Sequence, residues 1–279
     1  MRLNPFGGSR RTRYADAVVT GAGSGIGRAL AVELGRRGGR VVCADIDTDT
    51  ARDTVELVHE AGGKGFEVYC DVGSADQVAA LADTAEQWFG NPTDLVCNNA
   101  GIGAGGTPVG EAPLSEWHRV LDVNLWGVIH GCHVFAPRMR AAGHGAILNT
   151  ASAAAFGSAP RMAAYNVSKA GVLALSETLA AELVGTGVTV TALCPTAVRT
   201  HILDNAAIDD PSTARLGDLL LRWTGRPPAN IARETLDAVD RGQLYVVPQV
   251  EAKLIWQSKR LLPVPYTRAA GLIERLARR

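Results

Sequence analysis

Tyr165 and Lys169 are the two side chains of this 279-residue chain best suited to moving a proton. Their i, i+4 spacing puts both on one face of a helix. A tyrosine with a pKa near ~10 is a poor acid or base at neutral pH, and an adjacent ammonium lowers that pKa by favouring the phenolate. An isolated Tyr-x-x-x-Lys is more often a buried tyrosine beside an unrelated surface lysine, so the neighbouring sequence decides the interpretation.

Two further polar residues favour a shared site. Ser152 lies 13 residues before Tyr165 and follows the apolar run 146–149. At the carboxyl end of a strand its hydroxyl would lie where open α/β sheets bind ligands, so two hydroxyls could hold one substrate oxygen. Asn124 lies inside a helical segment among apolar residues, where a buried amide needs a partner. An ordinary hydrogen bond from helix to strand is the alternative for Asn124.

A glycine-rich turn, Thr20-Gly21-Ala22-Gly23-Ser24-Gly25-Ile26-Gly27, follows the first apolar run and opens a helical segment. Glycines at such a turn let the backbone approach a pyrophosphate, whose charge is stabilised by the free N–H groups of the helix start. A tight turn without a ligand is the alternative. We predict that this turn binds a dinucleotide through Gly21, Ser24, Gly25, Ile26 and Gly27.

Asp45 ends the second apolar run, 24 residues after Gly21. A carboxylate there accepts hydrogen bonds from ribose hydroxyls and repels a 2′-phosphate, so NAD is preferred over NADP. Ser24 and Ile46 are uncharged at positions where a cation would hold that phosphate. Nearby cations are interpreted as a solvated helix end, which suits positive charge: Arg36, Arg37 and Arg40.

From residue 15 to residue 248, short apolar runs alternate with segments of helical period. The predicted strands are residues 17–20, 40–44, 66–70, 95–97, 146–149, 188–193 and 244–247. The predicted helices are residues 25–37, 48–61, 74–89, 115–139, 163–184 and 229–240. Several strands lack a polar face, which indicates a parallel sheet covered on both sides by helices. We predict one doubly wound α/β domain that binds its ligand at the carboxyl ends of the strands.

The formal net charge of zero hides an uneven distribution. Residues 1–14 carry four Arg and no acid, and residues 251–279 carry seven Lys or Arg against two Glu. Residues 15–250 therefore hold 17 basic and 26 acidic side chains, a net charge of −9. An acidic body argues against a broad nucleic-acid surface.

Two extensions flank the domain: basic residues 1–14 and basic, helical residues 249–279. In the second, helices are predicted at 252–262 and 268–279, separated by Pro263-Val264-Pro265. The last helix has an apolar stripe among arginines. Packing of this stripe on the acidic body or on a neighbouring subunit is favoured over a peripheral membrane anchor.

No run approaches the roughly 18 to 20 apolar residues that span a bilayer, and the N-terminus lacks the apolar core of a secretory signal. A membrane-spanning or secreted protein is therefore not expected, and we predict a cytoplasmic one. The cysteines form no C-x-x-C pair and are interpreted as reduced thiols: Cys43, Cys70, Cys97, Cys132 and Cys194. Neither they nor the six histidines have metal-site spacing, so no metal is expected.

Over nearly all of residues 15–248, the chain resembles the short-chain dehydrogenase/reductase (SDR) family. The motifs that carry the resemblance occur in family order: Thr20-Gly21-x-x-x-Gly25-Ile26-Gly27, Asn98-Asn99-Ala100-Gly101, Asn124, Ser152 and Tyr165-x-x-x-Lys169. The resemblance implies a single Rossmann-type domain with a seven-stranded parallel sheet. It also implies NAD(P)-dependent alcohol oxidation or carbonyl reduction.

The resemblance assigns a role to each catalytic candidate. Tyr165 would be the general acid/base, and Ser152 would orient and stabilise the substrate oxygen. Lys169 would bind the nicotinamide ribose and lower the pKa of the tyrosine. Asn124 would hold a water that continues the proton relay from Lys169.

Further cofactor contacts are implied by the same resemblance. Asp71 and Val72 would contact the adenine, the segment Asn98 to Gly101, including Ala100, would stabilise its strand and line the cofactor, and Val198 and Thr200 would contact the carboxamide. A homodimer or homotetramer built by the helices of Asn124 and Tyr165 is also implied. One position departs from the family pattern, because Thr196 follows Pro195 where a glycine is usual. Threonine does not adopt positive φ cheaply, so the turn near the nicotinamide could differ.

The substrate is least specified. Residues 201–228 are predicted to form a substrate loop. The expected pocket segments, 102–106, 153–162 and 201–226, are mostly small or apolar, with Phe156, Met162, Leu203, Leu216 and Trp223 as walls. These walls indicate a hydrophobic secondary alcohol or ketone as the substrate. His201 could reach the site from the loop, but a lone histidine is more often a surface or structural residue. The alternatives are an NADP-dependent carbonyl reductase and a non-catalytic dinucleotide-binding or membrane-docked protein.

Overall fold

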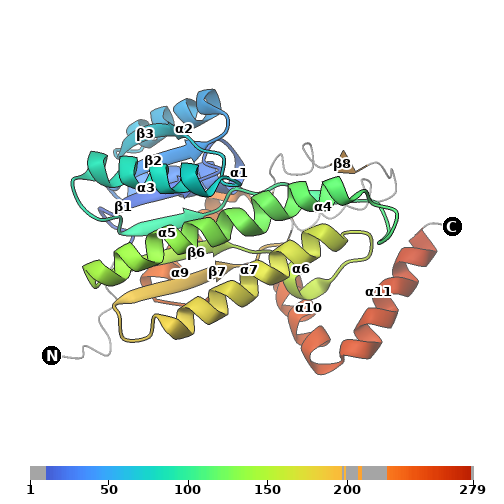
Figure 1. Cartoon of the computed structure of the whole chain (residues 1–279). Helices are drawn as coiled ribbons and strands as arrows, with labels where there is room; N and C mark the ends of the chain where they lie inside the picture. Colours follow the sequence, from blue (N-terminus) through green and yellow to red (C-terminus); the bar gives the residue numbers. More distant parts are fainter. Residues whose placement is uncertain (1–10, 197, 199–206, 209–224, 278–279) are drawn as a thin grey trace.

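A computed structural model of the chain describes residues 11–196, 198, 207–208 and 225–277. A parallel seven-stranded sheet with the strand order β3-β2-β1-β4-β6-β7-β9 forms its centre (Figure 1). The strands are β1 (Asp16–Thr20), β2 (Arg40–Asp45), β3 (Lys64–Tyr69), β4 (Leu95–Asn98), β6 (Gly145–Thr150), β7 (Val188–Leu193) and β9 (Tyr245–Val246). The predicted doubly wound α/β fold is confirmed.

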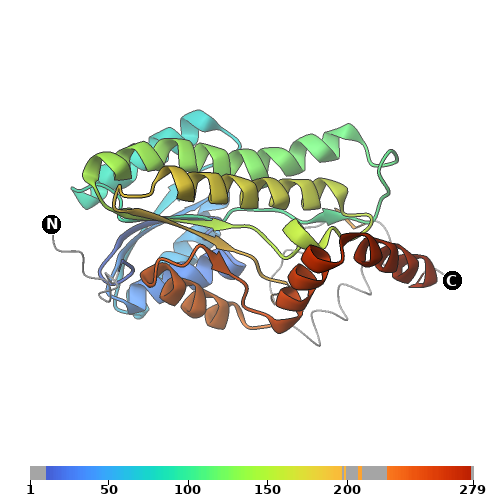
Figure 2. The same ribbon diagram turned by 90° about the horizontal axis from the view of Figure 1, so that it is seen from below.

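Helices cover both faces of this sheet, as Figure 2 shows edge-on. One layer holds α1 (Gly25–Arg36), α2 (Thr48–Glu60) and α9 (Pro228–Asp240). The other holds α3 (Ala75–Phe89), α4 (Leu114–Leu121), α5 (Gly127–Ala142) and α7 (Ala163–Glu182). Alternation of side chains along each strand supplies two cores. Val18, Val96 and Ile147 face the α3, α5 and α7 layer, whereas Val19, Cys97 and Leu148 face the α1 and α9 layer.

Three local features escape the sequence pattern. A π-helical turn, Asp122–Trp126, joins α4 to α5 within the helix predicted at 115–139. Strands β5 (Ala104–Gly105) and β8 (Ala207–Ile208) pair with each other, and α6 (Ala154–Gly157) follows β6 closely. Elements of two to five residues are too short to show a hydrophobic period.

The described part of the basic N-terminal extension, residues 11–14, is anchored to the body. The N–H and Oγ1 of Thr12 both donate to the Asp240 carboxylate at 2.9 Å. Arg11 donates to the carbonyls of Gly145 at 2.9 Å and Gly187 at 3.0 Å. These bonds join the segment to α9, to the first residue of β6 and to the loop that precedes β7.

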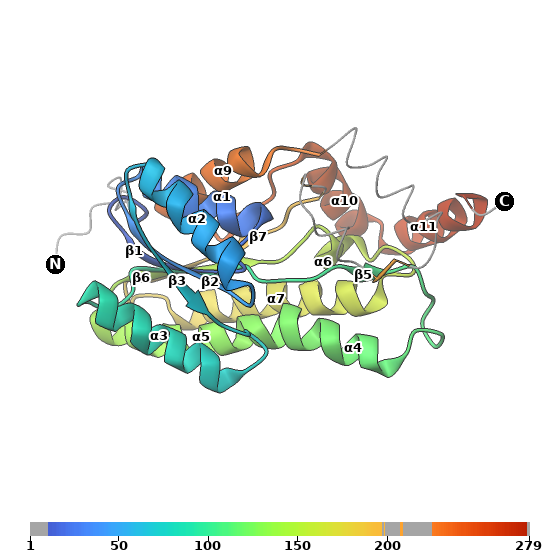
Figure 3. The same cartoon turned by 90° about the horizontal axis from the view of Figure 1, so that it is seen from above.

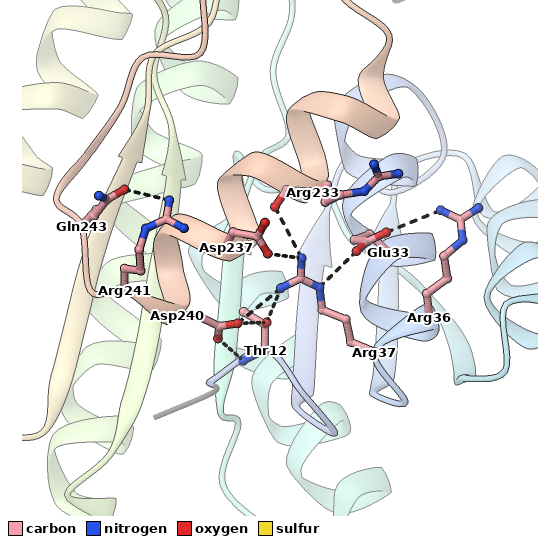
Figure 4. Close-up of polar contacts among 9 residues, drawn as sticks. All are labelled: Thr12, Glu33, Arg36, Arg37, Arg233, Asp237, Asp240, Arg241 and Gln243. Atoms are coloured by element: carbon pink, nitrogen blue, oxygen red, sulfur yellow. Dashed lines mark hydrogen bonds and ion pairs between the residues drawn. The ribbon is translucent and has the colours of Figure 1, made fainter. Parts of the chain in front are cut away.

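Arg37, just after α1, lies at the centre of the polar cluster in Figure 4. Its guanidinium donates to Thr12 Oγ1 at 2.8 Å, Asp237 at 2.7 Å, Asp240 at 3.3 Å and Glu33 at 3.2 Å. Only 12% of the Arg37 side chain is exposed, whereas Arg36 is 53% exposed. The interpretation of these cations as a solvated helix end is therefore wrong for Arg37, which binds α1 to α9 and to the N-terminal segment. It is also wrong for Arg40, which lies in β2 and donates to both Asp16 carboxylate oxygens at 2.6 Å.

Two helices form the C-terminal extension: α10 (Val250–Leu261) and α11 (Pro263–Ala277). α10 lies against α6 (Figure 3), where the Trp256 and Phe156 rings stack with centroids 5.5 Å apart. α11 begins at Pro263, five residues earlier than predicted, because prolines are tolerated in the first turn, where N–H groups have no intrahelical partner. Among the described helices, none is long and apolar enough to cross a membrane.

Candidate active site

The strand order reverses between β1 and β4, and the loops after these two strands are tied together there. The side-chain amide of Asn99 donates to the carbonyls of Thr20 at 3.0 Å and Gly21 at 3.4 Å. In return, Thr20 Oγ1 accepts the N–H groups of Asn99 at 2.9 Å and Ala100 at 3.1 Å. The switch point of the sheet is therefore built from the glycine turn and the Asn98-to-Gly101 motif, where the ligand crevice of such folds lies.

The conformation of the glycine turn requires glycine. Gly21 has a φ of 63° and Gly25 a φ of 54°, in the left-handed region. A Cβ atom on Gly21 would lie 2.8 Å from the Ala100 Cα, and one on Gly27 would lie 2.0 Å from the Gly21 carbonyl oxygen. The turn is thus packed against both its own helix and the loop after β4.

The N-terminus of α1 suits an anion. Its N-cap residue, Ser24, makes no side-chain capping bond, and its first turn contains no acid. In contrast, α2 and α3 are capped by the side chains of Asp47 and Ser74. The first N–H groups of a helix have no intrahelical partner and carry partial positive charge. The predicted pyrophosphate-binding residues from Gly21 to Gly27 therefore fit a dinucleotide phosphate.

Asp45 lies beside this helix start at the end of β2. Its Oδ2 accepts the Gly23 N–H at 2.8 Å, and its Oδ1 accepts the Asp47 N–H at 3.1 Å. Asp71 and Val72 follow the neighbouring strand β3; Asp71 Oδ1 accepts the Gly73 N–H at 2.9 Å, and Val72 is 6% exposed. The structure thus brings the residues expected at the ribose and adenine to one edge of the sheet.

Arg28 is a site residue that the sequence reasoning missed. Its guanidinium donates to the Gly23 carbonyl at 2.5 Å, Thr54 Oγ1 at 3.0 Å and the Thr50 carbonyl at 3.3 Å. Thr54 Oγ1 also donates to the Ala22 carbonyl at 2.9 Å. These bonds fix the glycine turn to α2. A possible signal was an arginine in the first turn of α1, where the helix dipole disfavours a cation without other partners.

Ser152, Tyr165 and Lys169 meet at the carboxyl end of β6. The Ser152 side chain lies close enough to Tyr165 to oppose the rise that burial causes in its pKa, and its hydroxyl donates to the Pro195 carbonyl at 3.4 Å. The Lys169 Nζ lies 5.8 Å from the Tyr165 ring centroid and donates to the Thr150 carbonyl at 2.9 Å. Lys169 is 3% exposed. The predicted trio therefore shares one site, and Lys169 is not the unrelated surface lysine of the alternative interpretation.

Burial controls the titration of this trio. It raises the pKa of Tyr165, and the nearby Ser152 side chain opposes that rise. Burial also lowers the pKa of Lys169 to about 8, against a smaller raising effect of Cys194. The expected lowering of the Tyr165 pKa by the ammonium is therefore wrong for the chain alone, because desolvation of the phenolate outweighs favourable contacts. Tyr165 consequently holds its proton at neutral pH.

Asn124 is fully buried in the π-helical turn. Its Oδ1 accepts the Ile102 N–H at 2.7 Å, and its Nδ2 donates to the Ile102 carbonyl at 2.9 Å. A Cβ atom on Gly101 would lie 3.2 Å from Asn124 Oδ1 and 3.4 Å from Lys169 Nζ. Asn124 thus bonds the backbone of the loop after β4, where the alternative expected a bond from helix to strand, and these bonds hold Gly101 close to Lys169.

The other expected cofactor residues are placed unevenly. Asn98 is 3% exposed and its Nδ2 donates to Asn149 Oδ1 at 2.9 Å, so its side chain joins β4 to β6 inside the core. Ala100 is half-buried beside Gly21. Val198 is 5% exposed and bridges Arg226. Thr200 lies outside the described residues, as do His201, Leu203, Leu216, Trp223 and most of the predicted substrate loop.

Thr196 does not strain the turn after β7. It is absent from the described residues with positive φ, so the expected cost of replacing glycine does not arise. Its N–H donates to Gln249 Oε1 at 3.2 Å and its Oγ1 to Glu251 Oε1 at 2.9 Å. Both acceptors lie at the start of α10. The departure from the family pattern is thus accompanied by contacts with the C-terminal extension.

Within the described ranges, no cluster of three or more His, Cys, Asp or Glu side chains could hold a metal ion. All five cysteines are free and buried. Burial raises the pKa of the Cys194 thiol, which lies near the trio, to about 12. Cys194 is therefore a neutral group in the surroundings of Lys169 and is not a nucleophile.

Comparisons with known proteins agree with this geometry. The family model "short chain dehydrogenase" matches residues 15–210. The probable oxidoreductase EphD of Mycobacterium tuberculosis is 35% identical over 267 residues, which are 92% of this chain but only 45% of EphD. The chain therefore spans less than half the length of that relative.

Two relatives are named for an activity. The 1-deoxy-11-beta-hydroxypentalenate dehydrogenase of Streptomyces avermitilis is 42% identical over 66% of this chain and 68% of its own. The 7alpha-hydroxysteroid dehydrogenase of Escherichia coli is 32% identical over 76% of this chain and 82% of its own.

Solved structures share the fold. A short chain dehydrogenase/reductase from Burkholderia phymatum in complex with NAD superposes with a TM-score of 0.81 at 35% identity, covering 88% of this chain and 92% of that one. An alcohol dehydrogenase from Thermococcus sibiricus complexed with 5-hydroxy-NADP has a TM-score of 0.71 at 26% identity, covering 84% and 95%. The family match, the relatives and the fold together show that this chain belongs to the short-chain dehydrogenases, a family of oxidoreductases.

Proposed function

We propose that this protein interconverts a hydrophobic secondary alcohol and its ketone with NAD, and that Tyr165 is the general acid/base. The observation that carries the proposal is the meeting of Ser152, Tyr165 and Lys169 at the carboxyl end of β6, on the same sheet edge as the glycine turn. NAD, when bound, supplies the hydride acceptor for oxidation and the donor for reduction.

The proton chemistry follows from the environment of Tyr165. During reduction Tyr165 gives its proton to the substrate oxygen; during oxidation it takes the hydroxyl proton back. The raised pKa of Tyr165 keeps the proton ready for donation. The resulting phenolate is stabilised by the Ser152 side chain, which opposes the rise that burial causes in the pKa of Tyr165. Lys169, with a pKa of about 8, is mostly charged at neutral pH and lies 5.8 Å from the centroid of the Tyr165 ring. Ser152 would also hold the substrate oxygen.

The residues that would hold NAD are those at the switch point. The uncapped start of α1 would bind the pyrophosphate, and Asp45 would accept the ribose hydroxyls. Preference over NADP is supported by the charge of Asp45, which repels a 2′-phosphate. Structures of relatives contain NAD in one case and 5-hydroxy-NADP in another, so the acid in this chain is the more specific argument.

An apolar substrate is supported by two observations. The expected wall Met162 is hydrophobic and lines a small cavity with Ala104 and Gly105, whereas Phe156 is packed on Trp256. Two relatives are named for a hydroxysteroid and for a hydroxypentalenate. We propose a bulky alicyclic alcohol of that kind as the substrate class.

We further propose a homodimer or homotetramer that works in the cytoplasm. Trp126 and Val167, on the helices of Asn124 and Tyr165, are both 49% exposed and could contact a second subunit. The five free cysteines suit a reducing compartment.

A cofactor and substrate panel tests the proposal. Steroid, terpenoid and linear secondary alcohols are incubated with NAD or NADP, and the reduced cofactor is followed by its absorbance. We expect turnover of an alicyclic alcohol and a kcat/KM with NAD at least about tenfold above that with NADP. Ser152→Ala should reduce kcat about a hundredfold, whereas Ser258→Ala, an exposed serine on α10, should not. A preference for NADP, or equal activity of both serine variants, contradicts the proposal.

A further inference from the structure

The C-terminal helix α11 presents an apolar stripe to solvent. Ala269, Leu272, Ile273 and Leu276 repeat at i, i+3, i+4 and i+7 and lie on one side of the helix. The three large side chains of this stripe are 59%, 63% and 66% exposed. Figures 1 and 2 both show α11 extending away from the sheet and its covering helices.

Contacts with the body come from the adjacent face of the same helix. Tyr266 Oη donates to the Gly157 carbonyl at 3.0 Å, and Glu274 pairs with Arg161 at 3.9 Å. Tyr266, Ala270 and Glu274 are spaced four residues apart and are half-buried. The apolar stripe is therefore turned away from the acidic body, and the expectation that the body covers it is wrong. The stripe is therefore exposed to solvent in the folded subunit.

The charges around the stripe are sorted by sign. Both acids of the extension are engaged inward, Glu251 with Thr196 and Glu274 with Arg161. The exposed charged residues of the two helices are all cations: Lys253, Arg260, Arg268 and Arg275. The extension from 251 onward has a net charge of +5, against −9 for residues 15–250. An apolar stripe bordered by cations matches the chemistry of an anionic lipid surface.

A second copy of the chain fits this stripe less well. Symmetric pairing of two α11 stripes would bring the two copies of Arg268 and of Arg275 towards one another, and like charges at an interface disfavour association. A lipid surface imposes no such cost, because anionic headgroups neutralise the same cations. The charge pattern therefore favours an anionic lipid surface over a second copy of the chain.

We propose that α11 docks the protein on an anionic lipid bilayer. The helix lies in the plane of the interface, with Leu272, Ile273 and Leu276 inserted between the lipids and Arg268 and Arg275 at the headgroups. Tyr266 and Glu274 hold this helix against Gly157 and Arg161, which lie between Ser152 and Tyr165 in the chain. If the proposed function holds, docking brings the site near a membrane reservoir of apolar alcohols; the docking itself does not depend on that function.

Sedimentation of the full chain with lipid vesicles tests the proposal. The probes are vesicles of phosphatidylcholine alone and vesicles with a minority of phosphatidylglycerol. We expect binding to the mixed vesicles at least about tenfold stronger than to the neutral ones, because each cation near an anionic surface adds about fivefold. The difference should shrink as salt is raised, since salt screens the surface charge.

Variants separate the apolar and the charged contributions. Leu272→Ser with Ile273→Ser should weaken binding to mixed vesicles more than about tenfold, because two inserted side chains are lost. Arg268→Gln with Arg275→Gln should weaken it about thirtyfold. Val184→Ser is the matched control, because Val184 is 80% exposed but follows α7 at the opposite end of that helix from Tyr165; it should bind like the unmodified protein. Removal of the whole extension is a poorer test, since Trp256 would be lost from its stack on Phe156.

Four results would overturn the proposal: no sedimentation with mixed vesicles, equal binding to neutral ones, or no effect of either double variant. The fourth is self-association of the unmodified chain in ultracentrifugation that Leu272→Ser with Ile273→Ser abolishes while vesicles stay unbound, which would assign the stripe to a second copy. Turnover is measured separately without vesicles, so failure of docking and failure of the proposed activity are distinguishable.

Discussion

Thr196 and Glu251 are joined by a hydrogen bond of 2.9 Å between Oγ1 and Oε1, which links the loop after β7 to the first turn of α10. The carbonyl of the preceding residue, Pro195, accepts the Ala153 N–H at 2.8 Å and the Ser152 hydroxyl at 3.4 Å. The C-terminal extension therefore contacts Thr196, and the preceding residue, Pro195, contacts the proposed catalytic Ser152 directly. With glycine at position 196, the hydrogen bond to Glu251 would be lost and only the bond from the N–H to Gln249 would remain.

The Thr196–Glu251 bond should contribute measurably to stability. Hydrogen bonds to a charged group typically contribute about 1.5 to 3 kcal/mol, and this one is half-buried, so we expect a coupling free energy of about 1 kcal/mol. A double-mutant cycle of Thr196→Val and Glu251→Ala, followed by urea unfolding, measures it. Thr196→Ser keeps the hydroxyl and serves as the control. Additive effects of the two substitutions would show that the bond contributes nothing.

Removal of the charge of Asp45 should relax the cofactor preference. Asp45→Asn keeps an acceptor for the Gly23 N–H but no longer repels a 2′-phosphate. We expect the ratio of kcat/KM with NAD to that with NADP to fall about tenfold or more. Steady-state kinetics with both cofactors measures the ratio. An unchanged ratio would mean that another group selects the cofactor.

Arg28 should act on cofactor binding through the glycine turn that it holds. Arg28→Met removes the bonds to the Gly23 carbonyl and to Thr54 and leaves the turn less fixed. We expect the KM for NAD to rise about tenfold with little change in kcat, because the interaction stabilises bound cofactor equally before and during the reaction. Arg36→Met is the matched control on the same helix, since Arg36 is 53% exposed. An equal effect of both variants would assign the change to net charge.

The lowered pKa of Lys169 predicts a pH dependence of stability. The group has a folded-state pKa of about 8 against an ordinary value of 10.5, so between these values the unfolded chain binds more protons. Stability through Lys169 therefore rises with pH across that window, by up to about 3 kcal/mol. The free energy of unfolding of the unmodified protein minus that of Lys169→Met, measured by urea at pH 7 and near pH 10.5, should increase. A difference that stays constant with pH would refute the lowered pKa.

The sequence predicted the sheet well because its strands are buried on both faces and read as apolar runs. Val18 and Val19 face opposite helical layers, yet both are fully buried, so no polar alternation obscured β1. The site residues that could be predicted are those in motifs with a fixed spacing, such as Tyr165 and Lys169. In such motifs, the residue types and their spacing along a single element are enough to indicate the site.

What could not be predicted depends on contacts between distant segments. Arg28 reaches Thr54, Thr196 reaches Glu251, and Arg37 reaches Asp240. No local pattern indicates such pairs. The pKa of Tyr165 was predicted in the wrong direction for a related reason, because the spacing shows the nearby ammonium but does not show how deeply the phenol is buried.

The central claim is that Tyr165 performs the proton transfer, and Tyr165→Phe tests it most directly. The substitution removes the hydroxyl and keeps the ring, so the dissociation constant for NADH, measured by fluorescence, should stay within about twofold of that of the unmodified protein. Turnover of an alicyclic alcohol should fall by at least about a hundredfold, the usual contribution of a general acid or base. Near-normal turnover by Tyr165→Phe, with NADH still bound, would contradict the assignment.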